Sequence, residues 1–198
     1  MLKDIAIENV LFLDIETAPA FPEYSKAEER LKKLWDKKSE QLKREPDDTP
    51  ESLFPRAGIY AEFGKVICIS AGLFKGREFR IKSFYGDDEY QLLVQFCKML
   101  NSHYGGEKKM LFAHHGKEFD FPFLARRILI HGIPLPAILD VAGRKPWEVQ
   151  FLDTMELWKF GDYKHYTSLE LLAAIFGIPT PKDDISGSDI HRVYWEDH

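Results

Sequence analysis

Two acidic residues near the start of the chain have the spacing of a metal site. Asp14 and Glu16 lie in the second half of an apolar run, residues 9–17, that has the length of a β-strand. Because side chains alternate along a strand, both carboxylates project from one face, about 7 Å apart, and repel each other unless a cation lies between them. Carboxylate oxygens favour Mg²⁺ or Mn²⁺, and two such ions suit phosphoryl chemistry. The alternative is a strand end whose acids point into water.

A third acid, Asp120, stands between an expected strand at residues 110–115 and an expected helix at residues 123–130. An acid at such a place can simply be the N-cap of the helix, because its side chain accepts a hydrogen bond from a free backbone N–H. Asp153 has a similar setting, and we expect it to be an N-cap. Asp120 becomes more informative when it is taken together with the two acids of the first strand.

The order of these acids resembles that of a known superfamily. Asp-x-Glu on a first strand, followed by His-Gly-Lys-Glu-Phe-Asp before a helix, resembles the DEDD superfamily of 3′–5′ exonucleases, the DnaQ-like proofreading nucleases with an RNase H-like fold. More narrowly, the chain is similar to predicted exonucleases related to the proofreading domain of family B DNA polymerases, and residues 57–67 and 168–179 also match that family. The resemblance implies that three residues are catalytic acids and ligands of two divalent cations, Mg²⁺ or Mn²⁺: Asp14, Glu16 and Asp120. The two ions would activate the attacking water and stabilise the leaving 3′-oxygen.

The resemblance also implies a set of substrate contacts: Thr17, His115, Gly116, Phe119 and Tyr166. Thr17 would lie beside the terminal nucleotide. His115 stands where the family usually has asparagine, an exchange that keeps a hydrogen-bond donor but makes it titratable. Tyr166 belongs to a polar aromatic loop that could stack on a base, with core packing or plain exposure equally open.

The family's fourth acid is missing from the expected place. Relatives carry Tyr-x-x-x-Asp on a final helix, but only ten residues follow the landmark Ser186-Gly187-Ser188. We therefore expect a truncated C-terminus and a nearly inactive chain, unless another acid fills the fourth position. The candidates are Asp153, Asp183 and Asp184.

These features leave three functional interpretations. The first is a metal-dependent 3′–5′ exonuclease acting on the ends of single-stranded nucleic acid, with DNA favoured over RNA. The second is a catalytically weak or inactive nucleic-acid-binding module with the same fold. The third, a relative of resolvases or transposases, would require a grip on duplex DNA that nothing in the sequence resembles.

Composition sets the class of protein. With 198 residues, 44% of them hydrophobic and 30% charged, the chain can bury a core of its own, which excludes a disordered chain and a membrane-spanning one. The net charge of −5 argues weakly against a binder of nucleic acid over the whole surface. The two cysteines, Cys68 and Cys97, lack metal or redox spacing, and no signal peptide is visible, so we expect a cytoplasmic protein.

The pattern of elements predicts an α/β protein. Strands are expected at residues 9–17, 64–73, 78–85, 110–115 and 151–154, the second and third forming an antiparallel hairpin. We expect a single domain over residues 1–198 with an RNase H-like fold. Its mixed central sheet would have about five strands, three antiparallel and two parallel, flanked by helices.

A charged helical insertion is expected at about residues 24–50. Between residues 26 and 45 it carries eight Lys or Arg residues against five acids. Its helix is expected at residues 26–44 and should pack through Leu31, Leu34 and Trp35. This helix is either a solvated amphipathic element or a basic flap for a phosphate backbone. His114 is expected in the core, whereas Arg126 and Arg127 are a solvated helix face or a contact for one phosphate.

Overall fold

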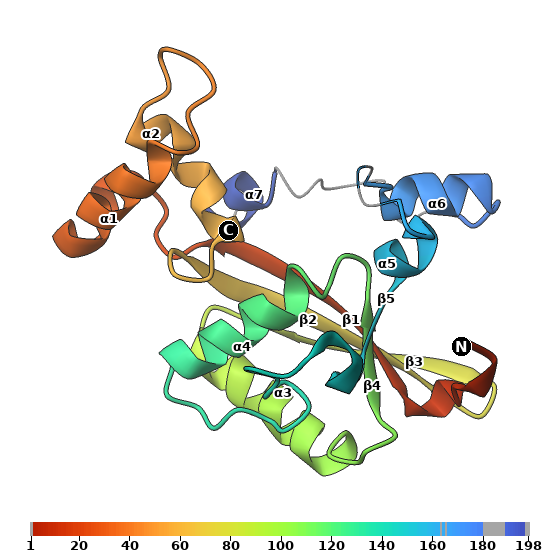
Figure 1. Ribbon diagram of the computed structural model, residues 1–198. Coiled ribbons are helices and arrows are strands. Elements are labelled where there is room, and N and C mark those ends of the chain that lie inside the picture. The colour runs from red at the N-terminus through yellow and green to blue at the C-terminus, as the bar shows by residue number, and fades with distance from the viewer. Residues whose placement is uncertain (1, 163, 165, 180–188, 197–198) are drawn as a thin grey trace. The chain divides into compact units, whose positions relative to one another are not determined.

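The computed structural model describes residues 2–162, 164, 166–179 and 189–196. In this part of the chain a five-stranded sheet has the order β3-β2-β1-β4-β5. The strands are β1 (Val10–Pro19), β2 (Gly64–Lys75), β3 (Glu78–Tyr85), β4 (Met110–Ala113) and β5 (Phe151–Asp153), as Figure 1 shows. β1, β4 and β5 run parallel, while β2 and β3 are antiparallel. The predicted α/β class and mixed sheet are confirmed.

The β2–β3 hairpin matches its sequence pattern closely. Lys75 pairs with Glu78, so the turn contains two residues, and Gly76 within it has a φ of 62°. Two-residue hairpin turns need such left-handed backbone, which glycine adopts without a steric penalty.

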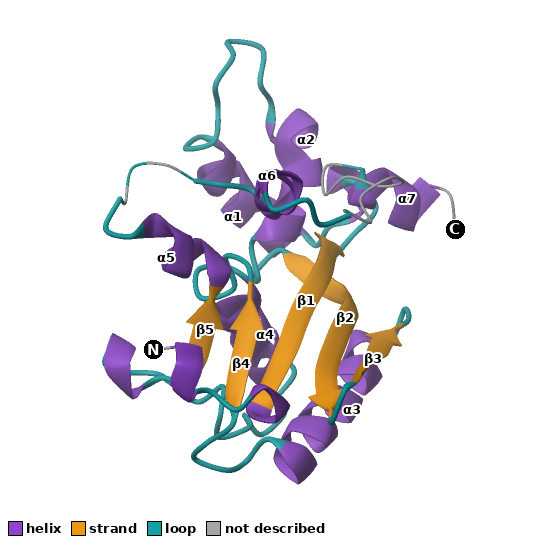
Figure 2. Ribbon diagram, turned by 90° about the vertical axis from the view of Figure 1, so that its right-hand side faces the viewer, coloured by secondary structure: helices purple, strands orange, loops and turns teal. Residues whose placement is uncertain are grey.

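Two long helices lie on one face of the sheet, α3 (Glu89–His103) and α4 (Asp120–Ile130), as Figure 2 shows. α3 begins where Asp88 accepts a hydrogen bond from the backbone N–H of Gln91 at 3.0 Å. The fully buried side chains of this layer include Leu93, Phe96, Leu100, Leu124 and Ile128. Removing this apolar surface from water holds the two helices on the sheet.

A buried ion cluster joins α3 to α4 and corrects one prediction. Arg127 is only 8% exposed, and its guanidinium binds the carboxylate of Glu89 through two hydrogen bonds of 2.9 and 2.6 Å. His131 Nε2 lies 2.8 Å from the same carboxylate. Arg127 is therefore neither solvated nor open to a phosphate, because helical spacing turns it toward α3, whereas Arg126 is exposed.

The chain forms two compact units. The first comprises Met1–Ile15 and Cys68–Asp184, and the second comprises Glu16–Ile67 and Ile185–His198. The second unit contains η3 (Tyr24–Lys26), α1 (Glu29–Ser39), α2 (Pro50–Leu53), η4 (Phe54–Ile59) and α7 (Ile190–Glu196). Its buried cluster consists of Ala27, Trp35, Leu53, Phe54 and Ala57.

The observed helix of the insertion, α1, is shorter than the helix that the sequence pattern predicts. α1 ends at Ser39 and turns follow, so residues 40–44 do not continue it. Trp35 is 1% exposed as predicted, but Leu34 is 47% exposed and does not pack. One position along a helix turns a side chain by about 100°, so the side that buries Trp35 leaves Leu34 in water.

The remaining elements are short. They are η1 (Leu2–Asp4), η2 (Ile7–Asn9), η5 (Pro146–Glu148), α5 (Thr154–Lys159) and α6 (Leu169–Ile175). Ser168 caps α6 by accepting a hydrogen bond from the N–H of Leu171. Within the described residues, no helix combines the length and apolar character needed to cross a membrane.

Candidate active site at β1 and the start of α4

The first unit brings two of the predicted acids together. Asp14 is exposed on β1 between the buried residues Leu13 and Ile15. Asp120 is the first residue of α4 and is 5% exposed. Its Oδ1 accepts a hydrogen bond of 3.2 Å from the backbone N–H of Ile15, next to Asp14. Phe119, not Asp120, occupies the N-cap position, so Asp120 is not the simple cap that was the alternative.

The surroundings of Asp120 make its carboxylate costly to ionise. Its pKa is raised to about 7, first by burial and then by the negative charge of Asp14, with a smaller contribution from Asp153. Hydrogen bonds from its own backbone N–H and from that of Ile15 act in the opposite direction. Two hard oxygen donors whose charges repel suit a divalent cation, which would favour the ionised form.

Glu16 and Thr17 continue β1 beyond Asp14, but they belong to the second compact unit. Glu16 is exposed and Thr17 is half-buried. Their participation in a site with Asp120 stays a prediction. In the described part of the chain, no group of three or more His, Cys, Asp or Glu side chains is arranged to hold a metal ion.

Asp153 organises the loop before α4. Its carboxylate caps α5 through the N–H of Met155 at 2.9 Å, which confirms the predicted N-cap. It also accepts hydrogen bonds from the backbone N–H groups of His115 at 2.9 Å and Lys117 at 3.1 Å. These three bonds engage both oxygens, so Asp153 is poorly suited to be the fourth metal ligand. The other two candidates, Asp183 and Asp184, lie outside the described residues.

His115, in the loop held by Asp153, lies beside Tyr166, another predicted substrate residue. His115 has a φ of 63°, and its ring meets that of Tyr166 edge to face at 5.5 Å between centroids. Histidine and asparagine tolerate left-handed backbone better than most residues, so the φ of His115 is compatible with its residue type. Tyr166 is 66% exposed, so its ring is accessible beside His115.

Two further predicted substrate residues, Gly116 and Phe119, shape this loop. A Cβ on Gly116 would come within 2.4 Å of the Cβ of Ala113, so only glycine fits there without displacing β4. Phe119 is half-buried and packs on Phe123 at 5.5 Å between ring centroids. Both residues are therefore fixed by packing, whatever they contact in a substrate.

Two connections made by His114 and Asp153 were not predicted from the sequence. His114 is half-buried, and its two ring nitrogens lie 2.8 Å from Thr154 Oγ1 and 3.1 Å from the carbonyl oxygen of Thr167. It thus links the end of β4 to α5 and to the segment before α6. The available signal was that His114 directly follows β4 and Asp153 is the last residue of β5, the neighbouring parallel strand.

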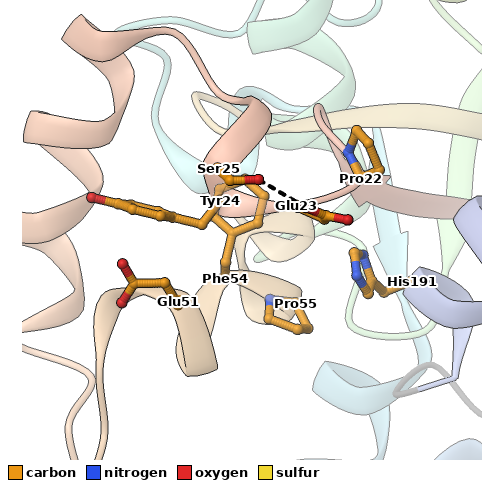
Figure 3. A pocket seen from close by; sticks show the side chains of 8 residues that line it. All are labelled: Pro22, Glu23, Tyr24, Ser25, Glu51, Phe54, Pro55 and His191. Carbon is orange, nitrogen blue, oxygen red and sulfur yellow. Dashed lines mark hydrogen bonds between the residues drawn. The ribbon is translucent and has the colours of Figure 1, made fainter.

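A separate cavity of about 270 Å³ lies within the second unit. Figure 3 shows its lining, in which Glu23 and Glu51 lie near the rings of Tyr24 and Phe54. His191 also lines it, and its Nδ1 is buried without a hydrogen-bond partner among the described residues. Burial lowers the pKa of His191, which favours its neutral form. Two carboxylates and no lysine or arginine make this cavity unsuitable for a phosphate chain.

With the acid pair and the sheet described, comparison with known proteins decides the family. A family model described as the RNase_H superfamily matches residues 56–197. The chain belongs to the RNase_H superfamily. This result and the sheet topology confirm the predicted RNase H-like fold.

Comparison with solved structures finds a DNA polymerase and an exonuclease. The family B DNA polymerase of the hyperthermophilic archaeon Pyrobaculum calidifontis is 16% identical, with a TM-score of 0.51 over 94% of this chain and 20% of that one. E. coli exonuclease I in complex with a dT13 oligonucleotide is 10% identical, with a TM-score of 0.48 over 92% of this chain and 38% of that one. The chain thus spans about a fifth of the polymerase and two fifths of exonuclease I. A search of curated proteins finds no match.

The raised pKa of Asp120 predicts a pH-dependent stability. In the metal-free protein, the protonated carboxyl is favoured by folding, so this contribution is complete below the unfolded-state pKa near 4 and is lost as the pH rises through about 7. Asp120→Asn keeps an acceptor for the Ile15 N–H but removes the charge. Its free energy of unfolding in EDTA should match that of the wild type near pH 4 and exceed it by about 2–4 kcal/mol at pH 8. Urea unfolding at both pH values measures this, and equal stability at pH 8 would contradict the burial of an ionisable group.

Proposed function

We propose that this chain is a metal-dependent 3′–5′ exonuclease that removes nucleotides from single-stranded nucleic acid, with DNA favoured, by two-metal phosphodiester hydrolysis. The observation that carries the proposal is the pairing of Asp14 with the buried Asp120 in a member of the RNase_H superfamily. A buried carboxylate beside a second acid, with a strongly shifted pKa, is typical of a functional site.

Three acids would hold the cations: Asp14, Glu16 and Asp120. When bound, two Mg²⁺ or Mn²⁺ ions would supply a more acidic water and a stabilised leaving oxygen. Asp120 contributes an ionised carboxylate once its proton has been displaced. Thr17 would contact the terminal nucleotide.

The loop before α4 would bind the substrate. Asp153 fixes the backbone of residues 115–117, so His115 keeps its orientation beside Tyr166. An exposed tyrosine ring next to a histidine offers a stacking surface for an unpaired base, and stacking is worth about 1–3 kcal/mol per base. Gly116 and Phe119 would complete the contact, because both are held rigidly in the same loop.

A second candidate function is nucleic-acid binding without turnover. It is favoured by the bonding of Asp153, a candidate for the fourth acid, because both of its carboxylate oxygens already accept hydrogen bonds from backbone N–H groups. Loss of one carboxylate from a two-metal site weakens metal binding and slows hydrolysis. Such a module would bind single strands but leave them intact.

We propose a location in the reducing cytoplasm, because Cys68 and Cys97 form no disulfide in the described part of the chain. Burial raises the pKa of Cys97 to about 11, which makes this thiol unreactive at neutral pH.

The test compares labelled single-stranded DNA and RNA of one sequence in the presence of Mg²⁺, Mn²⁺ or EDTA. The proposal predicts loss of full-length strand with either cation, no loss in EDTA, and faster loss of DNA than of RNA. Strands that stay intact while the protein binds them would select the binding module. Degradation that persists in EDTA would contradict a metal-dependent mechanism.

A further inference from the structure

Helix α1 has a row of exposed cations opposite its buried side. The helix carries five basic residues and two acids. Arg30, Lys33 and Lys37 are spaced three and four positions apart, so they share one face and extend over about 10 Å. All three are exposed, and Leu34 beside them is 47% exposed. We call Arg30, Lys33 and Lys37 the cationic row.

The other charges of α1 are already engaged. Lys32 pairs with Glu29 at 2.9 Å, and Lys38 lies 4.5 Å from the centre of the Tyr60 ring. Asp36 accepts a hydrogen bond of 2.6 Å from the hydroxyl of Tyr24. Both acids of the helix therefore have partners within the second unit.

The side chains of the cationic row differ from these charges in their contacts. Among the described residues, none of its three members forms an ion pair, a hydrogen bond or a ring contact through its side chain. Lys33 lies within electrostatic reach of Glu29, but that carboxylate is bound to Lys32. The three positive charges of the row therefore contribute little to the stability of the fold.

The helix that carries the row is firmly anchored. Trp35 is 1% exposed, donates a hydrogen bond of 2.8 Å to the carbonyl oxygen of Pro50, and packs against the rings of Phe54 and Phe63 at 5.7 and 5.3 Å. A rigid helix fixes the spacing of the charges that it presents. Little backbone order would have to be gained on binding, which favours affinity.

We propose that the cationic row of α1 is an accessory site that binds the sugar-phosphate backbone of single-stranded nucleic acid. The inference deepens the proposed function, on which it rests for the choice of ligand. Lysine and arginine at intervals along a helix neutralise successive phosphates and release counterions, and this term carries no sequence preference. Exposed Leu34 adds an apolar contact for a sugar or base edge.

The site predicts a defined change in salt dependence. Each phosphate contact contributes about 0.7 to the slope of log affinity against log salt for single strands, so three contacts contribute about 2. Arg30→Gln, Lys33→Gln and Lys37→Gln together remove the row and keep residues that favour helix. A matched control changes three exposed cations of the first unit in the same way: Lys98, Lys108 and Arg144.

The experiment measures binding of a fluorescein-labelled oligothymidylate strand by anisotropy in EDTA, from 50 mM to 500 mM salt. The row variant should bind at least about tenfold more weakly at the lowest salt, with a slope flatter by about 2, while the control binds nearly as the wild type does. Equal losses in the row variant and the control, or no binding by the wild type, would overturn the inference.

Hydrolysis measured in parallel separates this inference from the proposed function. With Mg²⁺ and an excess of strand, the row variant should keep the turnover rate of the wild type and show only a raised KM. A wild type that binds through the row but does not hydrolyse the strand would refute the nuclease and leave the accessory site standing. Normal binding and hydrolysis by the row variant would refute the site and leave the nuclease standing.

Discussion

Asp120→Asn is expected to lower single-strand hydrolysis by at least about a thousandfold while the protein remains folded. The substitution replaces a carboxylate with a neutral amide of the same shape, so the hydrogen bond from the Ile15 N–H is kept and the metal ligand is weakened. Asp14→Asn should have a similar effect, because the proposed mechanism has both acids bind the same cation. The rate of loss of a labelled strand at saturating Mg²⁺ measures both.

Two controls separate chemistry from folding. Asp140→Asn changes another exposed acid of the first unit and should keep the activity of the wild type. Binding of the same strand in EDTA should be unchanged in Asp120→Asn or slightly tighter, since a negative charge has been removed. Activity within tenfold of the wild type in Asp120→Asn would show that this carboxylate is not a ligand.

Glu89→Ala is expected to cost about 3–5 kcal/mol of folding free energy, the largest stability effect that we predict for a single side chain. Glu89 accepts two hydrogen bonds from Arg127 and faces His131 inside the layer formed by α3 and α4. Its removal leaves a guanidinium buried without its carboxylate, and a charge desolvated in this way is strongly unfavourable. Urea unfolding of the metal-free protein measures the loss.

The matched variant removes both charges. Glu89→Leu combined with Arg127→Met replaces the ion pair by apolar side chains and should recover most of the loss, because a well-packed apolar pair is about as stable as a buried ion pair. A cost below about 1 kcal/mol for Glu89→Ala would show that water reaches Arg127. A double variant as unstable as the single one would assign the loss to packing.

The strands could be predicted because their signals are local, whereas the acid pair could be predicted only from a family resemblance. β3 was predicted with its observed bounds, since alternation and a two-residue turn with Gly76 define both of its ends. Asp14 and Asp120 could be paired across more than a hundred residues only through the order of motifs in a resembling family. The hydrogen bond between the Ile15 N–H and Asp120 provides the contact that the sequence could not show.

The errors arose where a side chain depends on a distant partner. The sequence around Arg127 does not indicate that its partner is Glu89 on α3. The arginine was therefore assigned to solvent or to a phosphate contact. Leu34 fits an apolar stripe by spacing, yet Trp35 is bulkier and determines which side of α1 is buried. The second role of Asp153 was missed because its bonds to residues 115 and 117 join loops that are far apart in sequence.

The central claim is that the acid pair removes nucleotides from a 3′ end. The most direct measurement follows one single strand labelled at its 5′ end, with a free or a blocked 3′ terminus, in Mg²⁺ or Mn²⁺, for the wild type and Asp120→Asn. Our account predicts a ladder that shortens from the 3′ end with time, absent when that end is blocked and absent in Asp120→Asn. Internal cuts that ignore the block, or equal degradation by Asp120→Asn, would contradict it.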